Sequence, residues 1–207
     1  MIKIDNVEVV GFKHAIRGMR NPMNSWAKSD SEFSSHNNAL WIIGENDLDL
    51  MKRLRQAGTD HRKYMRMITV YLDITSHHAW WAEFDTYKVG TVRNSCSKMH
   101  KIHVAPFTLE NFSHEGCNEI SFALVHLERT IAILEDLRQK FNETQSRKYW
   151  RAIIELLPMG YNLKATVQLN YEVLANMYKS RKNHKLDEWR EFCKWIETLP
   201  LNELIRG

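Results

Sequence analysis

One long amphipathic stretch in the middle of the chain does most to limit the fold. From Asn118 to Phe141, apolar residues recur at the three- and four-residue spacing that places side chains on one face of an α-helix. The apolar positions are Ile120, Leu124, Leu127, Ile131, Leu134, Leu137 and Phe141. This stretch therefore predicts a helix, and any fold assigned to the chain must contain it.

Two stretches nearer the N-terminus have the alternating pattern of β-strands, and they run from Ile2 to Phe12 and from Met67 to Thr75. Helical spacing predicts further helices at residues 47–56, 78–85, 147–156, 163–180 and 186–197. We expect a short helix and a long surface loop over residues 13–44, and an extended, partly ordered segment over residues 86–118. Strands followed by helices favour an α+β fold, with a small antiparallel sheet and a helical bundle.

The size and charge of the chain narrow its class. A length of 207 residues with 43% hydrophobic content predicts a single domain spanning residues 1–207. Lys and Arg total 29 against 25 Asp and Glu, and this net charge of +4 is small for a protein that binds duplex nucleic acid. It suffices for a small anionic ligand, such as a nucleotide or a folate tail. Neither G-x-G-x-x-G nor G-x-x-x-x-G-K-[ST] occurs, so the common phosphate loops are excluded.

The cysteines and the N-terminal sequence indicate the compartment. Three cysteines with no C-x-x-C pair favour a reducing environment over a disulfide framework. The N-terminal residues lack the apolar core of a signal peptide, and no run approaches the roughly 18 apolar residues of a membrane span. We therefore expect a cytoplasmic protein with neither a membrane nor a nucleic-acid partner.

The stretch from Leu163 to Ser180 carries the polar residues that bear most on function. Treated as one helix, it has an apolar stripe that includes Asn170, and Arg181 lies about 20° further round and about 16 Å along the axis. A buried amide or guanidinium group must be hydrogen-bonded, because burying it alone costs several kcal/mol. Either Asn170 caps a neighbouring loop and Arg181 pairs with a carboxylate such as Glu188, or both bind a polar ligand along the helix face.

The C-terminal third of the sequence resembles the signature of flavin-dependent thymidylate synthases. That signature contains Leu-Pro, a helix with two spaced Asn residues, an Arg, and then E-I-R. The matching residues are Leu157, Pro158, Asn170, Leu174, Asn176, Arg181, Glu188, Trp189 and Arg190. The spacing from Pro158 to Arg181 fits without a gap, and Glu188 requires a one-residue deletion.

The segment from Thr86 to Met99 corresponds to the signature loop of the same family, R-H-R-x-x-S-x-N-x-x-S-x-R-Y. In this chain the first Arg, the His, the Asn and the Tyr of the loop are replaced. The conservative substitutions are Lys88 for Arg, Thr91 for Ser, Cys96 for Ser and Lys98 for Arg. Glu83 stands where the family often has a nucleotide-binding Gln.

The resemblance implies an enzyme that transfers a one-carbon unit from methylene tetrahydrofolate to dUMP with reduced FAD. It also implies NADPH as a co-substrate and a homotetrameric assembly. The flavin-binding residues that it implies are Lys88, Asn170 and Asn176. The substrate-binding residues that it implies are Glu83, Thr91, Cys96, Lys98 and Arg181. An Arg suits this role because its planar fork offers several donors to a phosphate or a ring carbonyl.

The altered loop leaves two other functions open. One is a non-catalytic pyrimidine-nucleotide-binding or regulatory homologue, and the other is an enzyme that modifies a different pyrimidine nucleotide, such as dCMP. Cys96 either lines the site or is a structural cysteine, unless Lys88 or Lys98 lowers its pKa. The histidines at 77, 78, 100, 103 and 114 lack the ligand spacing of a zinc site, so we expect no metal. The Trp residues at 80, 81, 150, 189 and 195 are expected in the core.

Overall fold

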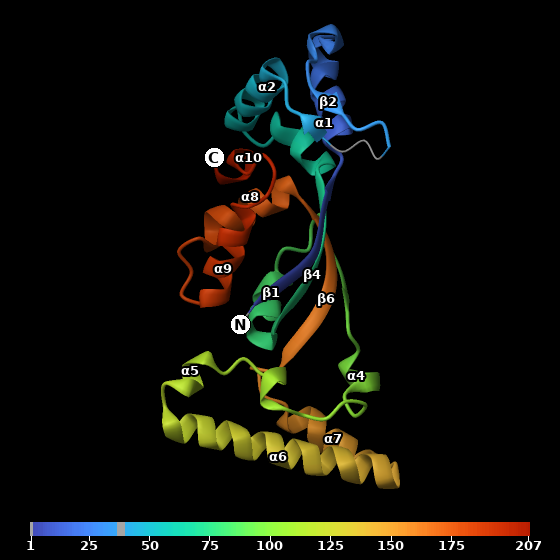
Figure 1. The fold of residues 1–207 in the computed structure, drawn as a ribbon, viewed down its shortest axis with the longest axis vertical. Helices are drawn as coiled ribbons and strands as arrows, with labels where there is room; N and C mark the ends of the chain where they lie inside the picture. Colours follow the sequence, from blue (N-terminus) through green and yellow to red (C-terminus); the bar gives the residue numbers. More distant parts are fainter. Residues whose placement is uncertain (1, 37–39) are drawn as a thin grey trace. The chain divides into compact units, whose positions relative to one another are not determined.

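A computed structural model describes residues 2–36 and 40–207 (Figure 1). Its strands are β1 (Lys3–Val10), β2 (Glu32–Phe33), β3 (Leu40–Ile42), β4 (Thr69–His77), β5 (Val92–Ser95) and β6 (Asn162–Asn170). Its α-helices are α1 (Phe12–Arg20), α2 (Glu45–Gln56), α3 (His78–Phe84), α4 (Lys98–Lys101), α5 (Glu115–Asn118), α6 (Ser121–Thr144), α7 (Arg147–Leu156), α8 (Tyr171–Arg181), α9 (Asp187–Ile196) and α10 (Glu203–Arg206). Short 3₁₀ helices are η1 (Asn21–Met23), η2 (Trp26–Lys28), η3 (Arg62–Met67) and η4 (Leu109–Asn111).

Four strands form one sheet in the order β1-β4-β6-β5, and β2 pairs with β3 in a separate antiparallel ribbon. The α+β prediction with a small sheet is confirmed. Strand β4 buries alternate residues from Val70 to Ser76, and β6 does the same from Leu163 to Leu169. This alternation is the period of a strand that buries one face. The alternating sequence of each central strand therefore determines which of its faces is buried.

The contacts within the chain define two compact units. Unit 1 contains residues 74–85 and 94–165 together with the first residues of the chain, and unit 2 contains residues 4–73, 86–93 and 166–207. Strands β4 and β6 contribute residues to both units. The single domain expected from chain length stays a prediction.

Unit 1 is built around the long helix predicted from the sequence. Helix α6 packs against α7, and a cluster of apolar side chains lies between them and the segment from Ile102 to Phe112. Of the described α6 residues, only Ile131 and Leu134 are buried. The rest of its apolar surface includes Phe122, which is 79% exposed, and Ile133, which is 51% exposed. Helix α6 therefore has more apolar surface than unit 1 itself covers.

Unit 2 contains a compact helical core. Helix α8 packs against η3, α9 and α10, and η3 also packs against α1 and α2. The chain crosses closely where Gly11, at φ +98°, leaves no room for a Cβ beside the carbonyl oxygen of Met67. Trp189 and Phe192 of α9 are fully buried and meet edge to face. The expected core positions of Trp80, Trp81 and Trp189 are confirmed, whereas Trp150 and Trp195 are half-buried.

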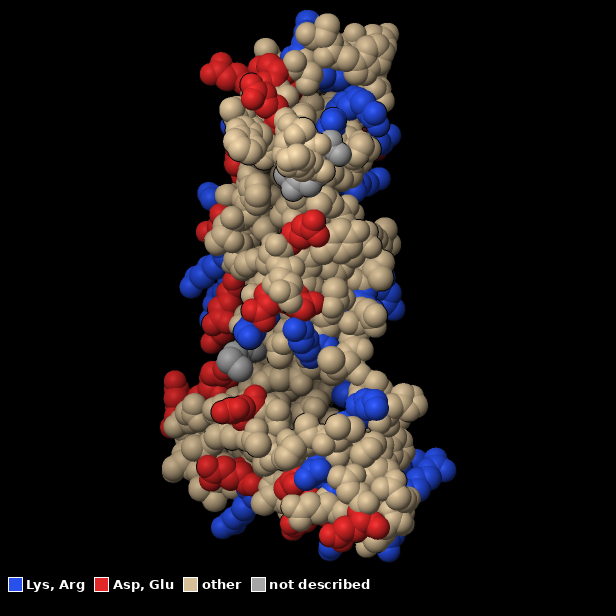
Figure 2. Space-filling view, turned by 45° about the vertical axis from the view of Figure 1, so that its right-hand side comes forward, with Lys and Arg blue, Asp and Glu red and all other residues tan. Residues whose placement is uncertain are grey.

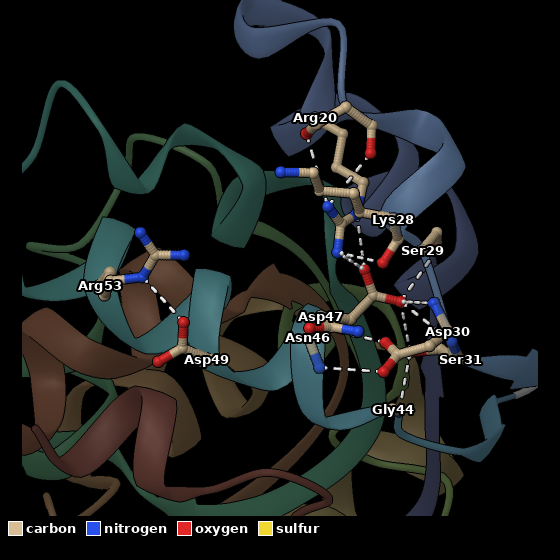
Figure 3. Close-up of polar contacts among 11 residues, drawn as sticks. Arg20, Lys28, Ser29, Asp30, Ser31, Gly44, Asn46, Asp47, Asp49 and Arg53 are labelled. Carbon is tan, nitrogen blue, oxygen red and sulfur yellow. Dashed lines mark hydrogen bonds and ion pairs between the residues drawn. The ribbon is translucent and has the colours of Figure 1, made fainter.

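A buried ion pair between Arg20 and Asp47 organises one end of unit 2 (Figure 3). Arg20 is 3% exposed and Asp47 is fully buried, and the nitrogen–oxygen distance between them is 2.6 Å. Arg20 also donates to the carbonyl oxygens of Ser25 and Lys28. The second oxygen of Asp47 accepts from the hydroxyls of Ser29 and Ser31 and from two main-chain N–H groups. Every charged atom of the pair therefore has a partner, which is what burial of charge requires.

The same loop caps helix α2. Asp30 accepts hydrogen bonds from the main-chain N–H groups of Asn46 and Asp47, in the first turn of that helix. These donors have no partner within the helix, so a carboxylate there satisfies them and complements the helix dipole. Burial alone would raise the pKa of Asp47, but hydrogen bonds from Ser31, Arg20 and Ser29 outweigh it and hold the pKa below its usual value.

The secondary-structure predictions succeeded where one period dominates. Helix α7 has the predicted bounds, and α2, α3, α6, α9, β1 and β4 differ from theirs only at the ends. The long loop predicted over residues 13–44 is wrong in part, because β2 and β3 pair within it, and its residues 37–39 lie outside the described residues. The segment at 86–118 contains the short elements β5, α4, η4 and α5.

Candidate functional site

The predicted helix over residues 163–180 is wrong in its first half. Residues Asn162–Asn170 form strand β6, and helix α8 begins at Tyr171 without an intervening loop. The buried residues Leu163, Ala165, Val167 and Leu169 alternate with exposed polar ones, which is a period of two. The polar pair therefore does not share one apolar helical stripe, because Asn170 is the last residue of the strand.

Asn170 serves as the N-cap of α8. Its Oδ1 accepts a hydrogen bond of 3.1 Å from the main-chain N–H of Val173, with an extended backbone of φ −133° and ψ 169°. Asn is among the residues best suited to this position. The capping alternative that the sequence left open is correct in kind, although the group that Asn170 caps is its own helix.

The segment at residues 86–93 lies along α8 within unit 2. Gly90, at φ +79°, sits so close to the start of α8 that a Cβ there would lie 2.9 Å from Asn170 Nδ2 and 3.2 Å from a methyl group of Val173. Tyr87 reaches the other end of the helix, where its hydroxyl meets Arg181. The segment therefore runs beside α8 from its last residue to its cap, and it brings the altered signature loop against the two-Asn, one-Arg helix.

Arg181 ends α8 between two aromatic rings. Its Nε donates to the Tyr87 hydroxyl at 3.0 Å, and its guanidinium carbon lies 4.9 Å from the centre of the Trp189 ring and 5.6 Å from that of Tyr87. Arg181 is half-buried and Trp189 is fully buried. Such contacts hold a guanidinium group by its face and by one N–H.

Asn176 lies on the exposed side of α8. Its Oδ1 faces Arg62 Nη2 at 3.4 Å, and Arg62 Nε lies 2.9 Å from a carboxylate oxygen of Glu172. Glu172 is 7% exposed and occupies the first turn of α8, where its charge complements the helix dipole. Arg62 and Glu172 are polar residues of this region that the sequence did not single out, because they lie 110 residues apart.

The other two predicted residues of unit 2 are Lys88 and Thr91, on the segment beside α8. Lys88 is exposed. Thr91 is half-buried, and its hydroxyl oxygen is shielded from solvent without a hydrogen-bond partner among the described residues. A shielded hydroxyl of this kind is costly unless a ligand or water pairs with it.

The remaining predicted residues, Glu83, Cys96 and Lys98, belong to unit 1. Lys98 Nζ lies 3.1 and 3.3 Å from the two ring nitrogens of His78, and that ring stacks on Tyr161 with 6.0 Å between ring centres. Cys96 is exposed, and its main-chain N–H donates to Lys164. Burial first, and then Cys96, raise the pKa of Tyr161. Glu83 is half-buried on α3.

The described residues contain no group of three or more His, Cys, Asp or Glu side chains that could hold a metal ion. Within residues 2–36 and 40–207, no helix combines the length and apolar character needed to span a bilayer. In unit 2 the predicted site residues lie around α8, and in unit 1 the predicted Lys98 lies beside His78.

The fold is that of the flavin-dependent thymidylate synthases. A crystal structure of thymidylate synthase X from Helicobacter pylori with FAD and dUMP aligns over 100% of both chains, with a TM-score of 0.74 and 14% sequence identity. A second structure of this enzyme complexed with FAD and dUMP covers 99% of this chain and 98% of its own, with a TM-score of 0.68 and 16% identity. No family model and no curated protein sequence matches the chain. The resemblance inferred from residues 157–190 is confirmed at the level of fold.

Proposed function

We propose that the chain binds a pyrimidine nucleotide and FAD, and acts as a thymidylate synthase-like enzyme that transfers a one-carbon unit to dUMP. The observation that carries this proposal is the segment at residues 86–93, which packs along α8 and contacts both Asn170 and Arg181. It does so in a fold that matches, over its full length, an enzyme solved with FAD and dUMP.

The residues of unit 2 fit an acceptor-rich ligand. Asn170 and Asn176 use Oδ1 in their protein contacts, so Nδ2 is the atom of each that can donate to a flavin carbonyl or ring nitrogen. Lys88 is an exposed cation that suits a phosphate, and the Thr91 hydroxyl is shielded without a partner among the described residues. In the proposed site Lys88, Asn170 and Asn176 hold the flavin, which when bound supplies the reducing equivalent.

The substrate contacts follow from the same chemistry. Arg181 offers a planar, permanently charged donor group to a phosphate or a pyrimidine carbonyl, and Thr91 adds a hydroxyl. Lys98 would provide a second cation, while Glu83 and Cys96 would line the nucleotide site. These side chains orient and charge-balance the substrate, which is the protein's share of catalysis in a cofactor enzyme. Methylene tetrahydrofolate as carbon donor and NADPH as reductant complete the proposed reaction in the cytoplasm.

A homotetramer is part of the proposal, and the apolar surface of α6 supports it. A groove of about 1140 Å³ in unit 1 is lined by Cys117, Phe122, Val125, Leu156 and Pro158, among others. A helix with so much exposed apolar surface is suited to burial against another copy of the chain. Light scattering after gel filtration should give a tetramer, and Phe122→Glu should reduce its size while Glu128→Gln, at an exposed position of the same helix, should not. A monomeric wild-type protein would contradict the assembly.

No nucleic-acid partner is proposed. On the face shown in Figure 2, acidic and basic side chains are interspersed rather than gathered by sign. A protein that tracks a phosphate backbone instead concentrates Lys and Arg along one surface.

The absorbance spectrum of the purified protein is the direct test. Bound flavin gives a yellow protein, and dUMP added to it should perturb the flavin bands and raise the melting temperature. Formation of dTMP from dUMP, methylene tetrahydrofolate, NADPH and FAD then tests turnover, and a parallel assay with dCMP tests the choice of base. A colourless protein that binds neither FAD nor dUMP would remove the proposal.

The second candidate is a non-catalytic pyrimidine-nucleotide-binding protein. Replacement of the first Arg and the His of the signature loop favours it, because the loop then lacks the planar charged fork and the imidazole that the family signature carries. For this candidate dUMP should raise the melting temperature, and no dTMP should form under the assay conditions above.

A further inference from the structure

The surroundings of Arg181 contain two residues that the signature of the family does not predict. Tyr87 occupies the middle of T-Y-K, where the signature loop reads R-H-R, and Trp189 occupies the middle of E-W-R, where the signature reads E-I-R. Although 102 positions separate them in the sequence, both rings contact the same guanidinium group. Two departures from the motif therefore meet at one side chain.

Each half of this aromatic pair is itself held in place. Trp189 is fully buried and meets Phe192 edge to face at 5.8 Å and His184 at 6.4 Å between ring centres. Tyr87 lies three residues before Gly90, whose backbone is pressed against Asn170 and Val173. The ring centres of Tyr87 and Trp189 are 6.0 Å apart, with 58° between their planes. The guanidinium group therefore contacts two rings that are fixed from different elements of unit 2.

The two contacts restrain different motions of Arg181. The face of the Trp189 ring sets the position of the guanidinium plane, and the hydrogen bond from Nε to the Tyr87 hydroxyl sets its rotation within that plane. An isoleucine at position 189 would offer no π-electron face. An unrestrained Arg loses much rotamer freedom when it binds a ligand, so restraint beforehand strengthens binding.

We infer that Tyr87 and Trp189 are positioning residues that fix the guanidinium group of Arg181 for contact with the pyrimidine nucleotide. This inference rests on the proposed function, in which Arg181 binds that nucleotide. Tyr87 acts through its hydroxyl and Trp189 through its ring face, and neither residue needs to touch the ligand.

The test compares Tyr87→Phe with Tyr178→Phe. Tyr178→Phe is a matched control because it also removes a hydrogen bond from a tyrosine hydroxyl, in this case the bond from Tyr178 to Glu197. The ring of Tyr178 contacts Lys182 rather than Arg181. The first readout needs no ligand: the ¹H–¹⁵N signal of the Arg181 Nε–H, assigned by its disappearance in Arg181→Lys. We expect its exchange with water to be at least tenfold faster in Tyr87→Phe and unchanged in Tyr178→Phe. The second readout is the Kd for dUMP, expected to rise three- to tenfold in Tyr87→Phe and to change less than twofold in the control.

The outcomes separate this inference from the proposed function. An Arg181 signal that is unchanged in Tyr87→Phe overturns the inference, and so does wild-type affinity for dUMP in that variant, while the proposed function stands. If the wild-type protein binds no dUMP, the proposed function fails, and the nucleotide-positioning role fails with it even where the exchange result is as expected. A loss of order and of affinity confined to Tyr87→Phe supports the inference.

Discussion

Arg20 and Arg181 are both held firmly within unit 2, but by different chemistry. Arg20 is 3% exposed, and its guanidinium group meets a carboxylate, a hydroxyl and two carbonyl oxygens. Arg181 is half-buried and is held by a neutral hydroxyl and two ring faces. The first arrangement neutralises the charge and ties a loop to α2, whereas the contacts of Arg181 with Tyr87 and Trp189 restrain the group through neutral partners. The comparison distinguishes an arginine that maintains the fold from one suited to a ligand.

The largest effect is expected where the buried ion pair is broken. Asp47→Asn leaves Arg20 buried opposite a neutral group, and it should lower the free energy of unfolding by about 3–5 kcal/mol. Asp49→Asn on the same helix is the matched control, because its pair with Arg53 is about two-thirds exposed (66% and 65%) and should contribute less than about 0.5 kcal/mol. Urea denaturation of the two variants measures both values. Equal losses would remove the structural role given to Arg20.

A smaller loss is expected from Gly90→Ala, which tests the segment that carries Tyr87. The residue has φ +79°, where a side chain costs about 1–2 kcal/mol, and its Cβ would press on Asn170 Nδ2. Gly116→Ala is the control, since nothing lies within 4 Å of the Cβ that it would add. Thermal unfolding should show a lower melting temperature for the first variant only. An unchanged melting temperature in Gly90→Ala would mean that the segment is not pressed against α8.

Arg181→Met should have a modest effect on stability and a large effect on binding. It removes the hydrogen bond to Tyr87 and the cation–π contacts with two rings, and the expected loss of stability is roughly 1–2 kcal/mol. Loss of a charged contact to the nucleotide should raise the Kd for dUMP about tenfold or more. Calorimetric titration and urea denaturation of the same sample separate the two effects. A loss of stability comparable to that of Asp47→Asn, with unchanged binding, would reverse the contrast between the two arginines.

Glu135→Gln extends the comparison to an arginine of unit 1, and its effect is measured through the pH dependence of stability. Hydrogen bonds from Arg138 lower the pKa of Glu135 to about 2, despite the opposing effect of burial. Because the folded-state pKa lies below the ordinary value of 4.5, the stabilisation is complete above that pH and is lost as the pH falls towards 2. Wild-type stability should therefore fall more steeply than that of Glu135→Gln across this window, with Asp136→Asn as control. Parallel curves would show that the Arg138 pair contributes nothing.

The sequence predicted the elements whose pattern is local and uniform. Helix α7 was predicted to the residue, because its apolar spacing is purely helical. The prediction of one helix over residues 163–180 was wrong because a strand passes directly into a helix at Asn170, with no turn residue between them. A single helical period therefore fitted both halves of the stretch. The family resemblance singled out Asn170, Asn176 and Arg181 by spacing alone. The fold that it implies is confirmed although the secondary structure assigned to Asn170 was wrong, and the roles of the three residues stay a prediction.

The contacts that explain the site could not be predicted from the sequence. Tyr87 and Arg181 are 94 residues apart, Arg62 and Glu172 are 110 apart, and no local period links such pairs. Arg20 and Asp47 are separated by a loop that has no regular pattern. No local pattern links Tyr87 with Trp189: Tyr87 replaces the His of the signature loop, and Trp189 is expected in the core. Only the folded chain brings both rings to Arg181.

The two units also bear on how the gene could be divided for experiment. Unit 2 takes residues from both ends of the chain, and most of unit 1 is encoded between them. A truncation at any single point therefore cannot release unit 2 whole, and fragments that end inside β4 or β6 would split a strand that serves both units. Limited proteolysis and domain expression are poorly suited to this protein, and its functions must be separated by point substitution in the intact chain.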